Sequence, residues 1–311
     1  MVNKPFRFGL SIGGAGREEF VESVRRAEDG GFDTIWAPDH MDDRLAVFPM
    51  LAMAAEVSSS LRIASMVVAN DLRNPVLLAR DTATIDILSG GRFELGIGTG
   101  WIESHYEAVG IPYEGPGVRV ARLEEAISVV KGCWSGAPFD YEGRYYRVKG
   151  ATCPQPAQQP RPPIFIGGAR PRLLRIAGRE ADIVGISPLR ANAIGFERFG
   201  EDLATSGSRI RAQTEWIREG AGGRFKSIEL SLMPHVVVLT DDADGAAAEL
   251  ASETGTTPGE VLESPHILLG SRDRIADTLV ERRERYGVSY IVFGGTDFEA
   301  ITPVVERLSG T

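Results

Sequence analysis

A carboxylate and an imidazole stand side by side directly after a short apolar segment. Asp39 and His40 follow residues 34–37, whose composition predicts a buried β-strand. Histidine exchanges a proton near neutral pH without a large pKa shift, so it suits general acid or base chemistry. His40 is therefore the candidate catalytic residue, although a single histidine at a strand end is more often structural. His105, in the loop after a later strand, is a second candidate.

Two glycine-rich segments also follow predicted strands. Residues 96–100 (Gly-Ile-Gly-Thr-Gly) end one strand, and residues 167–170 (Gly-Gly-Ala-Arg) lie between another strand and a helix. Glycines in the first segment would let a flat ring system approach the backbone. The second segment offers backbone N–H groups and an arginine at a helix start, which favours a phosphate. A tight turn and an ordinary strand-to-helix turn are the alternative interpretations.

Several well-known site patterns do not occur in the sequence. Residues 13–16 (Gly-Gly-Ala-Gly) follow the first predicted strand but lack the spacing of a dinucleotide fingerprint, so we interpret them as a flexible loop. The histidines and cysteines are not at metal-ligand spacing, and we predict no metal site. His235 is expected to pack inside a strand, and His266 to lie in a loop.

Hydrophobic patterns alternate between strand and helix periods along the chain. The strands are predicted at residues 6–12, 34–37, 61–69, 92–98, 164–166, 182–186, 228–240 and 289–293. Helices are predicted between most of them, including one opened by Asn74 and Pro75. The alternation predicts an α/β fold, and the count of eight strands favours a (β/α)8 TIM barrel over a doubly wound sheet.

The domain organisation is predicted to be simple. We expect one domain over residues 1–311, with the connections at about 135–163 and 188–223 inserted at the barrel mouth. The first connection contains a hairpin pattern at 139–148, and the second is expected to be mostly helical. Long loops at a barrel mouth often shape the substrate site.

Bulk composition narrows the class of protein. The 311 residues are 43% hydrophobic and 25% charged, an ordinary globular composition. The formal net charge of -9 argues against a general nucleic-acid-binding surface. The two cysteines, Cys133 and Cys153, are isolated, and neither a signal peptide nor a membrane-length apolar run is found. We therefore expect reduced thiols and a cytoplasmic protein that does not bind a membrane.

The order and spacing of four segments carry a resemblance to a known family. They are Leu72–Arg80, Ser89–Trp101, Pro163–Gly168 and Ala177–Asp182. Together these segments resemble the luciferase-like monooxygenase superfamily, and within it the deazaflavin-dependent oxidoreductases that use coenzyme F420. The resemblance covers nearly the whole chain.

The resemblance implies a bacterial-luciferase-like barrel whose mouth holds a flavin or deazaflavin. Members often have a non-prolyl cis peptide in the third strand, here expected at Met66-Val67. The ring is expected near the Asp-His loop, the third strand end and the glycine loop after the fourth strand, with the cofactor phosphate near residues 167–170. The implied cofactor-binding residues are Asp39, His40, Met66, Val67, Val68, Ala69, Asn70, Gly98, Thr99, Gly100, Trp101, Gly167, Gly168, Ala169 and Arg170.

The Asp-His pair after the second strand is more similar to the F420 branch than to the oxygen-using branch. The resemblance therefore implies hydride transfer between F420 and a small organic substrate. His40 would act as proton donor or anion stabiliser, and Asp39 would hold the cofactor or the imidazole. An FMN-dependent monooxygenase that uses reduced flavin and oxygen, and a flavin-binding protein without turnover, are the alternatives. Relatives are often dimers, so a homodimer is expected.

The chain also departs from the F420 branch. Sugar-phosphate dehydrogenases of that branch carry a Trp four residues beyond the His and a Glu after Gly-Thr-Gly, where this chain has Arg44 and Trp101. Many relatives carry Glu where His105 stands. These differences argue against glucose 6-phosphate as the substrate.

Overall fold

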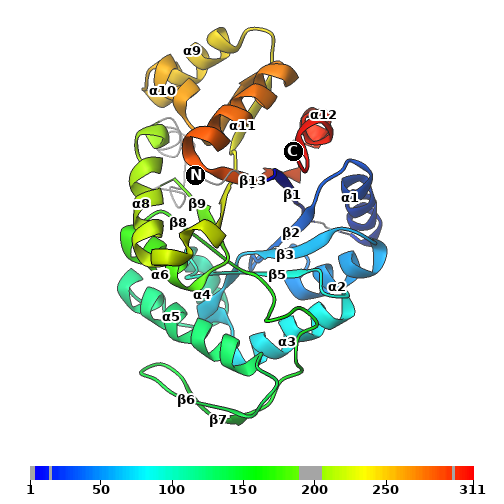
Figure 1. The fold of residues 1–311 in the computed structure, drawn as a ribbon, viewed down its shortest axis with the longest axis vertical. Coiled ribbons are helices and arrows are strands. Elements are labelled where there is room, and N and C mark those ends of the chain that lie inside the picture. Colours follow the sequence, from blue (N-terminus) through cyan, green and yellow to red (C-terminus); the bar gives the residue numbers. More distant parts are fainter. Residues whose placement is uncertain (1–3, 14–15, 189–204, 296–297) are drawn as a thin grey trace. The chain divides into compact units, whose positions relative to one another are not determined.

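The computed structural model describes residues 4–13, 16–188, 205–295 and 298–311 (Figure 1). Its contacts divide the chain into two compact units. The first unit contains Met1–Ser11, Arg26–Asp33 and Gly167–Thr311, and the second contains Ile12–Arg25 and Thr34–Ile166. The expected site residues up to Trp101 therefore belong to the second unit, and those from Gly167 onward belong to the first.

Parallel strands form the centre of the second unit. They are β2 (Thr34–Pro38), β3 (Arg62–Met66), β4 (Val68–Ala69), β5 (Phe93–Gly98) and the start of β8 (Ile164–Gly168). β2 pairs with β3, β3 and β4 pair with β5, and β5 pairs with β8. Every residue of β5 is buried, as expected for a parallel strand that is covered on both faces.

The second unit also contains most of the helices of the amino-terminal half. They are part of α1 (Arg17–Asp29), then α2 (Val47–Val57), η1 (Asn70–Leu72), α3 (Pro75–Leu88), α4 (Glu103–Ala108) and α5 (Pro116–Cys133). α3 begins as predicted, because Asn74 Oδ1 accepts from the backbone N–H groups of Val76 and Leu77 and Pro75 is its first residue. The predicted hairpin is formed by β6 (Phe139–Glu142) and β7 (Arg147–Ala151), and it extends beyond α3 and α5 (Figure 1).

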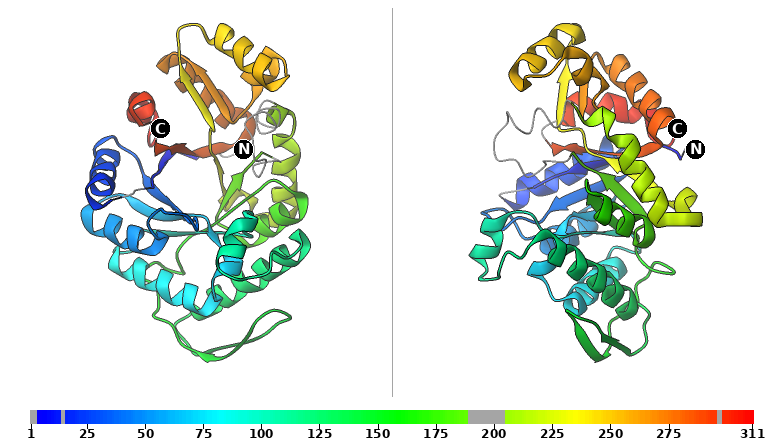
Figure 2. Two further views of the ribbon diagram at one scale, coloured as in Figure 1. Left: turned by 180° about the vertical axis from the view of Figure 1, so that it is seen from behind. Right: turned by 90° about the vertical axis from the view of Figure 1, so that its left-hand side faces the viewer.

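The first unit has its own parallel ladder. β1 (Arg7–Ser11), β13 (Val288–Gly294), β10 (Glu229–Leu232) and β9 (Ile183–Ile186) pair in that order. Its larger helices are α6 (Pro171–Glu180), α8 (Ile210–Ala221), α11 (Arg272–Tyr286) and α12 (Phe298–Leu308), with short turns at η2 (Thr205–Ser208) and η3 (Gly222–Ser227). A smaller sheet of β11 (Val236–Leu239) and β12 (Ile267–Gly270) packs with α9 (Ala243–Thr254) and α10 (Pro258–Glu263) around a separate apolar cluster (Figure 2).

The order of the parallel strands confirms the predicted fold class. In sheet order they are β3, β2, β1, β13, β10, β9, β8 and β5, and a further pairing between β3 and β5 closes the sheet. Helices follow most of these strands along the chain. The fold is therefore a (β/α)8 TIM barrel.

Two predicted strands are divided in the structure. The segment at 61–69 is interrupted after Met66 and gives β3 and β4. The prediction of one strand over 228–240 was wrong, because only β10 joins the barrel sheet while β11 pairs with β12. Pro234 lies between β10 and β11 and has no N–H, so it cannot donate to a continuous ladder.

The long connections match their predictions in part. The connection at 135–163 carries the predicted hairpin. In the connection at 188–223, residues 189–204 lie outside the described residues, and η2, α8 and the start of η3 follow them. Gly14 and Ala15 of the predicted loop at 13–16 also lie outside the described residues. The sequence did not reveal α4, α10 or β12, each of which has six residues or fewer, too few to show a clear period.

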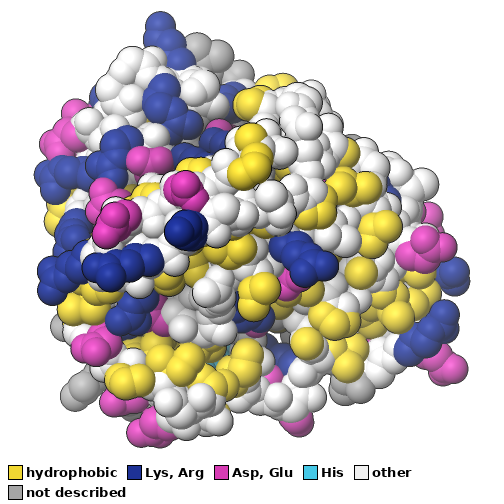
Figure 3. Space-filling view, turned by 90° about the horizontal axis from the view of Figure 1, so that it is seen from below, with side chains coloured by type: hydrophobic (Ala, Val, Ile, Leu, Met, Phe, Trp, Pro, Cys, Tyr) yellow, Lys and Arg dark blue, Asp and Glu magenta, His cyan; other side chains and the backbone are white. Residues whose placement is uncertain are grey.

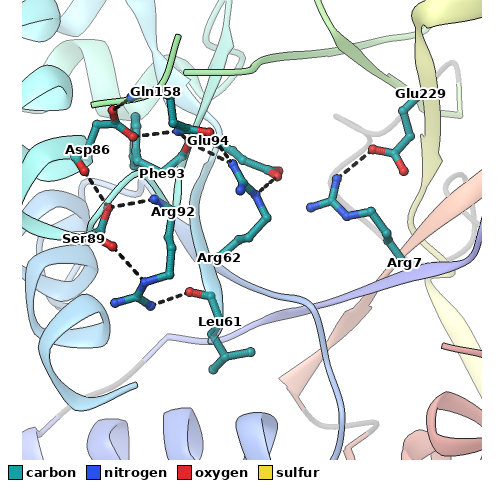
Figure 4. A network of polar contacts seen from close by, with 10 residues as sticks. All are labelled: Arg7, Leu61, Arg62, Asp86, Ser89, Arg92, Phe93, Glu94, Gln158 and Glu229. Carbon is teal, nitrogen blue, oxygen red and sulfur yellow. Dashed lines mark hydrogen bonds and ion pairs between the residues drawn. The ribbon is translucent and has the colours of Figure 1, made fainter. Parts of the chain in front are cut away.

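A buried polar network lies near the amino-terminal ends of β3 and β5 (Figure 4). Arg62 pairs with Glu94, whose side chain is 1% exposed, and donates to Gln158 Oε1 at 3.0 Å. Gln158 in turn donates from its side chain and its backbone to the two carboxylate oxygens of Asp86, at 2.6 and 2.9 Å. Because barrel active sites lie at the opposite ends of the strands, we interpret this network as structural.

Charged side chains form ion pairs in both units, and some of these pairs are partly buried. In the first unit, Arg7 and Glu229 pair at 2.7 Å at the starts of β1 and β10 (Figure 4). Figure 3 shows one face on which Lys and Arg side chains are interspersed with Asp, Glu and apolar side chains. Within the described ranges, every helix is too short or too polar to traverse a lipid bilayer.

Candidate active site

Asp39 follows β2, and its carboxylate forms hydrogen bonds with two other segments of the second unit. Its Oδ1 accepts a hydrogen bond from Arg73 Nη2 at 2.8 Å, and its Oδ2 accepts one from the Ala69 backbone N–H at 3.2 Å. The carboxylate side chain is 3% exposed. Among the described residues the carboxylate bonds to Arg73 and Ala69, and its charge acts to raise the pKa of His40, so its role toward the imidazole or the cofactor stays a prediction.

The structure brings the two candidate histidines together. His40 and His105 are both half-buried, and their rings meet edge to face with centroids 5.5 Å apart and planes at 82°. Burial lowers the pKa of His40 below its ordinary value of 6.5, and the Arg44 cation lowers it further, while Asp42 opposes them. The imidazole of His40 is therefore mainly neutral at pH 7 and can accept a proton.

The peptide bond between Met66 and Val67 is cis, as the family resemblance implied. Glycines of the paired strand β5 lie directly beside this segment. A Cβ on Gly96 would lie 1.8 Å from Ser65 O, and a Cβ on Gly98 would lie 2.7 Å from Val67 Cγ2. Val67 thus occupies the space that a side chain at Gly98 would need, and the approach of a ring to this glycine stays a prediction.

Three side chains, which we call the carbonyl clamp, hold three consecutive carbonyl groups of the loop after β5. The hydrogen bonds run from Tyr106 Oη to Thr99 O at 2.9 Å, from Arg119 Nη1 to Gly100 O, and from Tyr113 Oη to Trp101 O at 3.0 Å. Gly100 has a φ of 69°, and a Cβ there would lie 2.2 Å from Tyr106 Oη. Glycine is thus required at this position by both the backbone conformation and the clamp.

The residues implied at the third strand end differ in their accessibility. Met66 and Val67 are half-buried and remain accessible to a ligand. Val68 and Asn70 have no exposed surface, and Ala69 is 9% exposed. Val68 lies in the core because β4 pairs with β5, and the place of Val68 and Asn70 in the cofactor site stays a prediction.

Asn70 instead begins a buried polar cluster behind the strand ends. Its Nδ2 donates to Asp71 Oδ1 at 3.1 Å and to Tyr146 Oη at 3.2 Å, while its Oδ1 has no partner among the described residues. Asp71 also pairs with Arg122 at 2.7 Å. Burial raises the pKa of Asp71, and the Arg122 cation opposes this rise.

The glycine turn at 167–170 joins β8 to α6 in the first unit. Arg170 is the residue before α6 and is exposed, and Pro171 opens the helix without an N–H. The backbone N–H groups of Ala169 and Arg170 have no acceptor among the described residues. Gln213 Nε2 donates to Ala169 O at 3.3 Å. These N–H groups suit a phosphate oxygen, and phosphate binding by this turn stays a prediction.

Sequence reasoning missed Arg73 and the carbonyl clamp. No local spacing marks Arg73 as the partner of Asp39, which lies 34 positions earlier. Arg119 did leave a signal, because it stands four residues before Leu123 on the face of α5 that is buried. An arginine on an apolar helix face indicates a buried polar partner. No group of potential metal ligands occurs among the described residues.

Comparison with known proteins identifies the family. Residues 2–289 match the sequence profile described as "Luciferase-like monooxygenase". The chain belongs to the luciferase-like monooxygenase family. The resemblance inferred from the sequence motifs is thereby confirmed. Members of this family among the similar proteins include both flavin-dependent and F420-dependent enzymes.

Two relatives represent these two kinds of enzyme. The oxygenase component of the flavin-dependent trigonelline monooxygenase of Acinetobacter baylyi is 30% identical over 177 residues, which cover 55% of this chain and 49% of that protein. The F420-dependent glucose-6-phosphate dehydrogenase of Beutenbergia cavernae is 32% identical over 243 residues, 74% of this chain and 66% of that protein. The chain thus spans 49% to 66% of the length of these relatives.

A solved structure shows the same fold. The coenzyme F420 dependent tetrahydromethanopterin reductase from Methanopyrus kandleri matches with a TM-score of 0.75, over 98% of this chain and 100% of that chain, at 20% sequence identity. At this level of identity the match establishes the barrel architecture alone.

Proposed function

We propose that the chain is an oxidoreductase that transfers a hydride between coenzyme F420 and a small organic substrate. The observation that carries the proposal is the arrangement after β2, where the neutral imidazole of His40 stands against His105. The Asp-His pair at this strand end resembles the F420 branch of the family. The F420-dependent relative from Beutenbergia cavernae, which aligns with 74% of the chain, supports the same cofactor.

His40 is proposed as the residue that manages the proton. Bound F420 supplies two-electron hydride chemistry, so the protein must orient the substrate and accept or return a proton. In the direction of substrate oxidation, neutral His40 accepts the proton from the substrate, and its lowered pKa keeps it ready to do so at pH 7. The edge-to-face contact with His105 restrains the orientation of the His40 ring.

The remaining site residues are proposed to hold the cofactor. Met66 and Val67 would lie against its ring together with residues 98–101, and residues 167–170 would bind its phosphate. What supports this proposal is that the N–H groups of residues 169–170 lack acceptors among the described residues. Asp39 would act through Arg73 and Ala69 by fixing the two strand ends to each other.

The substrate is proposed to be a small molecule other than glucose 6-phosphate. Arg44 and Trp101 stand where the related sugar-phosphate dehydrogenases carry Trp and Glu. A cytoplasmic homodimer remains our expectation for the assembled protein, and size-exclusion chromatography with light scattering tests the dimer.

Equilibrium titration of the purified protein with F420 and with FMN tests the choice of cofactor. We expect F420 to bind at least about tenfold more tightly than FMN, a difference of ~1.4 kcal/mol. Turnover of bound F420 across a panel of alcohols, aldehydes and enones would then identify the substrate. Preferential binding of FMN would overturn the proposal.

The second candidate function is an FMN-dependent monooxygenase that uses reduced flavin and oxygen. The relative from Acinetobacter baylyi favours it, because its identity of 30% is close to that of the F420-dependent relative. Substrate-dependent oxygen consumption with reduced FMN, and none with reduced F420, would support this candidate. Tight cofactor binding with no turnover of any substrate would instead indicate a binding protein.

A further inference from the structure

The carbonyl clamp determines which side of the loop after β5 presents its carbonyl groups. The three clamp side chains form one cluster, in which the rings of Tyr106 and Tyr113 pack edge to face with centroids 4.9 Å apart. The guanidinium of Arg119 lies 4.1 Å from the centre of the Tyr113 ring. The carbonyl groups of residues 99–101 therefore all point toward the same cluster.

The amide groups of the same peptides must point away from the clamp. In a trans peptide the N–H lies antiparallel to the C=O, and the cis peptides among the described residues are elsewhere. The clamped peptides contribute the N–H groups of Gly100, Trp101 and Ile102, which have no acceptor among the described residues. Each of these residues is half-buried or exposed. Successive N–H groups on one side of a loop form a concavity that binds anions.

Arg119 places a positive charge directly behind this loop. It is 6% exposed, and its Nε has no hydrogen-bond partner among the described residues. It forms no ion pair there either, since Asp71, whose pKa it helps to lower, pairs with Arg122 at 2.7 Å. Arg119 thus shares the nearby Asp71 carboxylate with Arg122, so its buried charge is only partly compensated, and an anion on the amide side of the loop would offset part of the remaining free energy.

We propose that the backbone N–H groups of Gly100, Trp101 and Ile102 form an oxyanion site, and that the carbonyl clamp positions it. The site takes a carboxylate or phosphate oxygen of the substrate or of the bound cofactor. The His105 backbone N–H donates to Ile102 O at 3.1 Å, so the loop leads directly to the histidine whose ring contacts His40. Only the catalytic use of this oxyanion site rests on the proposed function.

Ile102→Pro removes one N–H donor of the oxyanion site. It breaks no hydrogen bond among the described residues, because this N–H has no acceptor there. Ile102 has a φ of -96° and a ψ of 107°, close to the range that proline adopts, and it precedes α4. Ile102→Ala shortens the side chain but keeps the N–H, so it is the matched control. The backbone amide chemical shifts of residues 100–102 are followed in the full chain during titration with inorganic phosphate and with acetate. The titrations are repeated with saturating F420.

We expect saturable shifts of these amides in the wild type and in Ile102→Ala. Anion affinity should fall about tenfold in Ile102→Pro, the effect of losing one hydrogen bond to a charged group. Anion binding that persists with F420 assigns the oxyanion site to the substrate, and competition assigns it to the cofactor. Tyr113→Phe, which releases Trp101 O, should also weaken anion binding while circular dichroism stays unchanged, and it serves as the test if Ile102→Pro does not fold.

Two results would overturn the oxyanion site. One is the absence of saturable shifts at residues 100–102 with either anion. The other is equal anion affinity in Ile102→Pro and Ile102→Ala. Neither result depends on which cofactor the chain binds, so failure of the oxyanion site and failure of the proposed function are measured separately.

Discussion

Burial and neighbouring charges determine the pKa of His40, and substitutions can separate the effects of two of these charges. Burial has the largest effect and lowers the pKa. Arg44 lowers it as well, and Asp42 raises it. Arg44 and Asp42 pair with each other at 2.9 Å and are both exposed, so either can be replaced without disturbing the core. The charge balance beside the imidazole is therefore adjustable by single mutations.

Opposite substitutions of this pair should move the pH profile in opposite directions. If neutral His40 accepts the proton, kcat/KM falls as pH drops through its pKa, which lies below 6.5. Arg44→Gln removes a neighbouring cation, raises the pKa and shifts the acid limb to higher pH. Asp42→Asn removes the anion, lowers the pKa and shifts the limb to lower pH. The pH profiles of both variants are measured from pH 4.5 to 8. A shift of the acid limb in the same direction in the two variants would contradict this account.

Removal of the imidazole itself should affect turnover and spare cofactor binding. We expect His40→Gln to lower kcat by about 10²–10⁴, the usual contribution of a positioned acid or base. The dissociation constant of F420 should change by less than about threefold, because glutamine keeps a polar side chain of similar reach. Steady-state kinetics and the cofactor titration provide the two measurements. Unchanged turnover would remove His40 from the mechanism.

At the scale of elements, the end of the third strand fits against β5 because β5 carries glycines there. Ser65 Oγ donates to Gly96 O at 2.8 Å and accepts from Gly96 N at 3.0 Å, which joins the two strands. Val67 occupies the space beside Gly98. The positions of Met66 and of the loop after β5 thus depend on each other through backbone contacts.

A pair of substitutions tests this contact between strands. Gly98→Ala places a Cβ 2.7 Å from Val67 Cγ2 and should lower the free energy of unfolding by about 1–3 kcal/mol. Val67→Ala removes that methyl group, so the double variant should recover part of the loss, with a coupling of at least ~0.5 kcal/mol. Gly259→Ala is the control, because its Cβ meets no atom within 4 Å. Urea unfolding of each variant is the measurement, and strictly additive effects would show that the two side chains do not meet.

At the scale of the whole molecule, His266 links stability to pH. It is 1% exposed, and its Nδ1 lies 2.9 Å from Met233 O. Burial lowers the pKa of His266 from 6.5 to about 3. Between these values the unfolded chain binds a proton at this residue and the folded chain does not, so stability falls as the pH drops from 6.5 toward 3.

A variant without this imidazole should lose part of that pH dependence. One proton bound only by the unfolded state changes the free energy of unfolding by ~1.4 kcal/mol per pH unit. His266→Asn should be less stable than the wild type at pH 7.5, because it repacks a buried site, and its stability should decrease less steeply below pH 6. Urea unfolding at several pH values from 4.5 to 7.5 measures both slopes. Parallel slopes would mean that His266 does not contribute to acid sensitivity.

The local patterns of the sequence determined the architecture and the position of the candidate site. Alternating strand and helix periods predicted the barrel, and the Asn74-Pro75 cap predicted the start of α3. The Asp-His pair and the glycine loop could be placed at strand ends, because a strand end is marked within a few residues. Such features depend on interactions between near neighbours, which periodicity and turn chemistry describe.

Only the tertiary structure decided which partner each group has. It showed that Asp39 binds Arg73, that Gly98 accommodates Val67 and that β11 pairs with β12. It also showed that the loop after β5 turns its carbonyl groups toward the carbonyl clamp. Some of these contacts join residues that are distant in the chain. Others depend on the direction of a single peptide plane. Hydrophobic periodicity specifies which face of an element is buried, whereas hydrogen-bond partners are selected only when the folded chain brings donors and acceptors within about 3 Å.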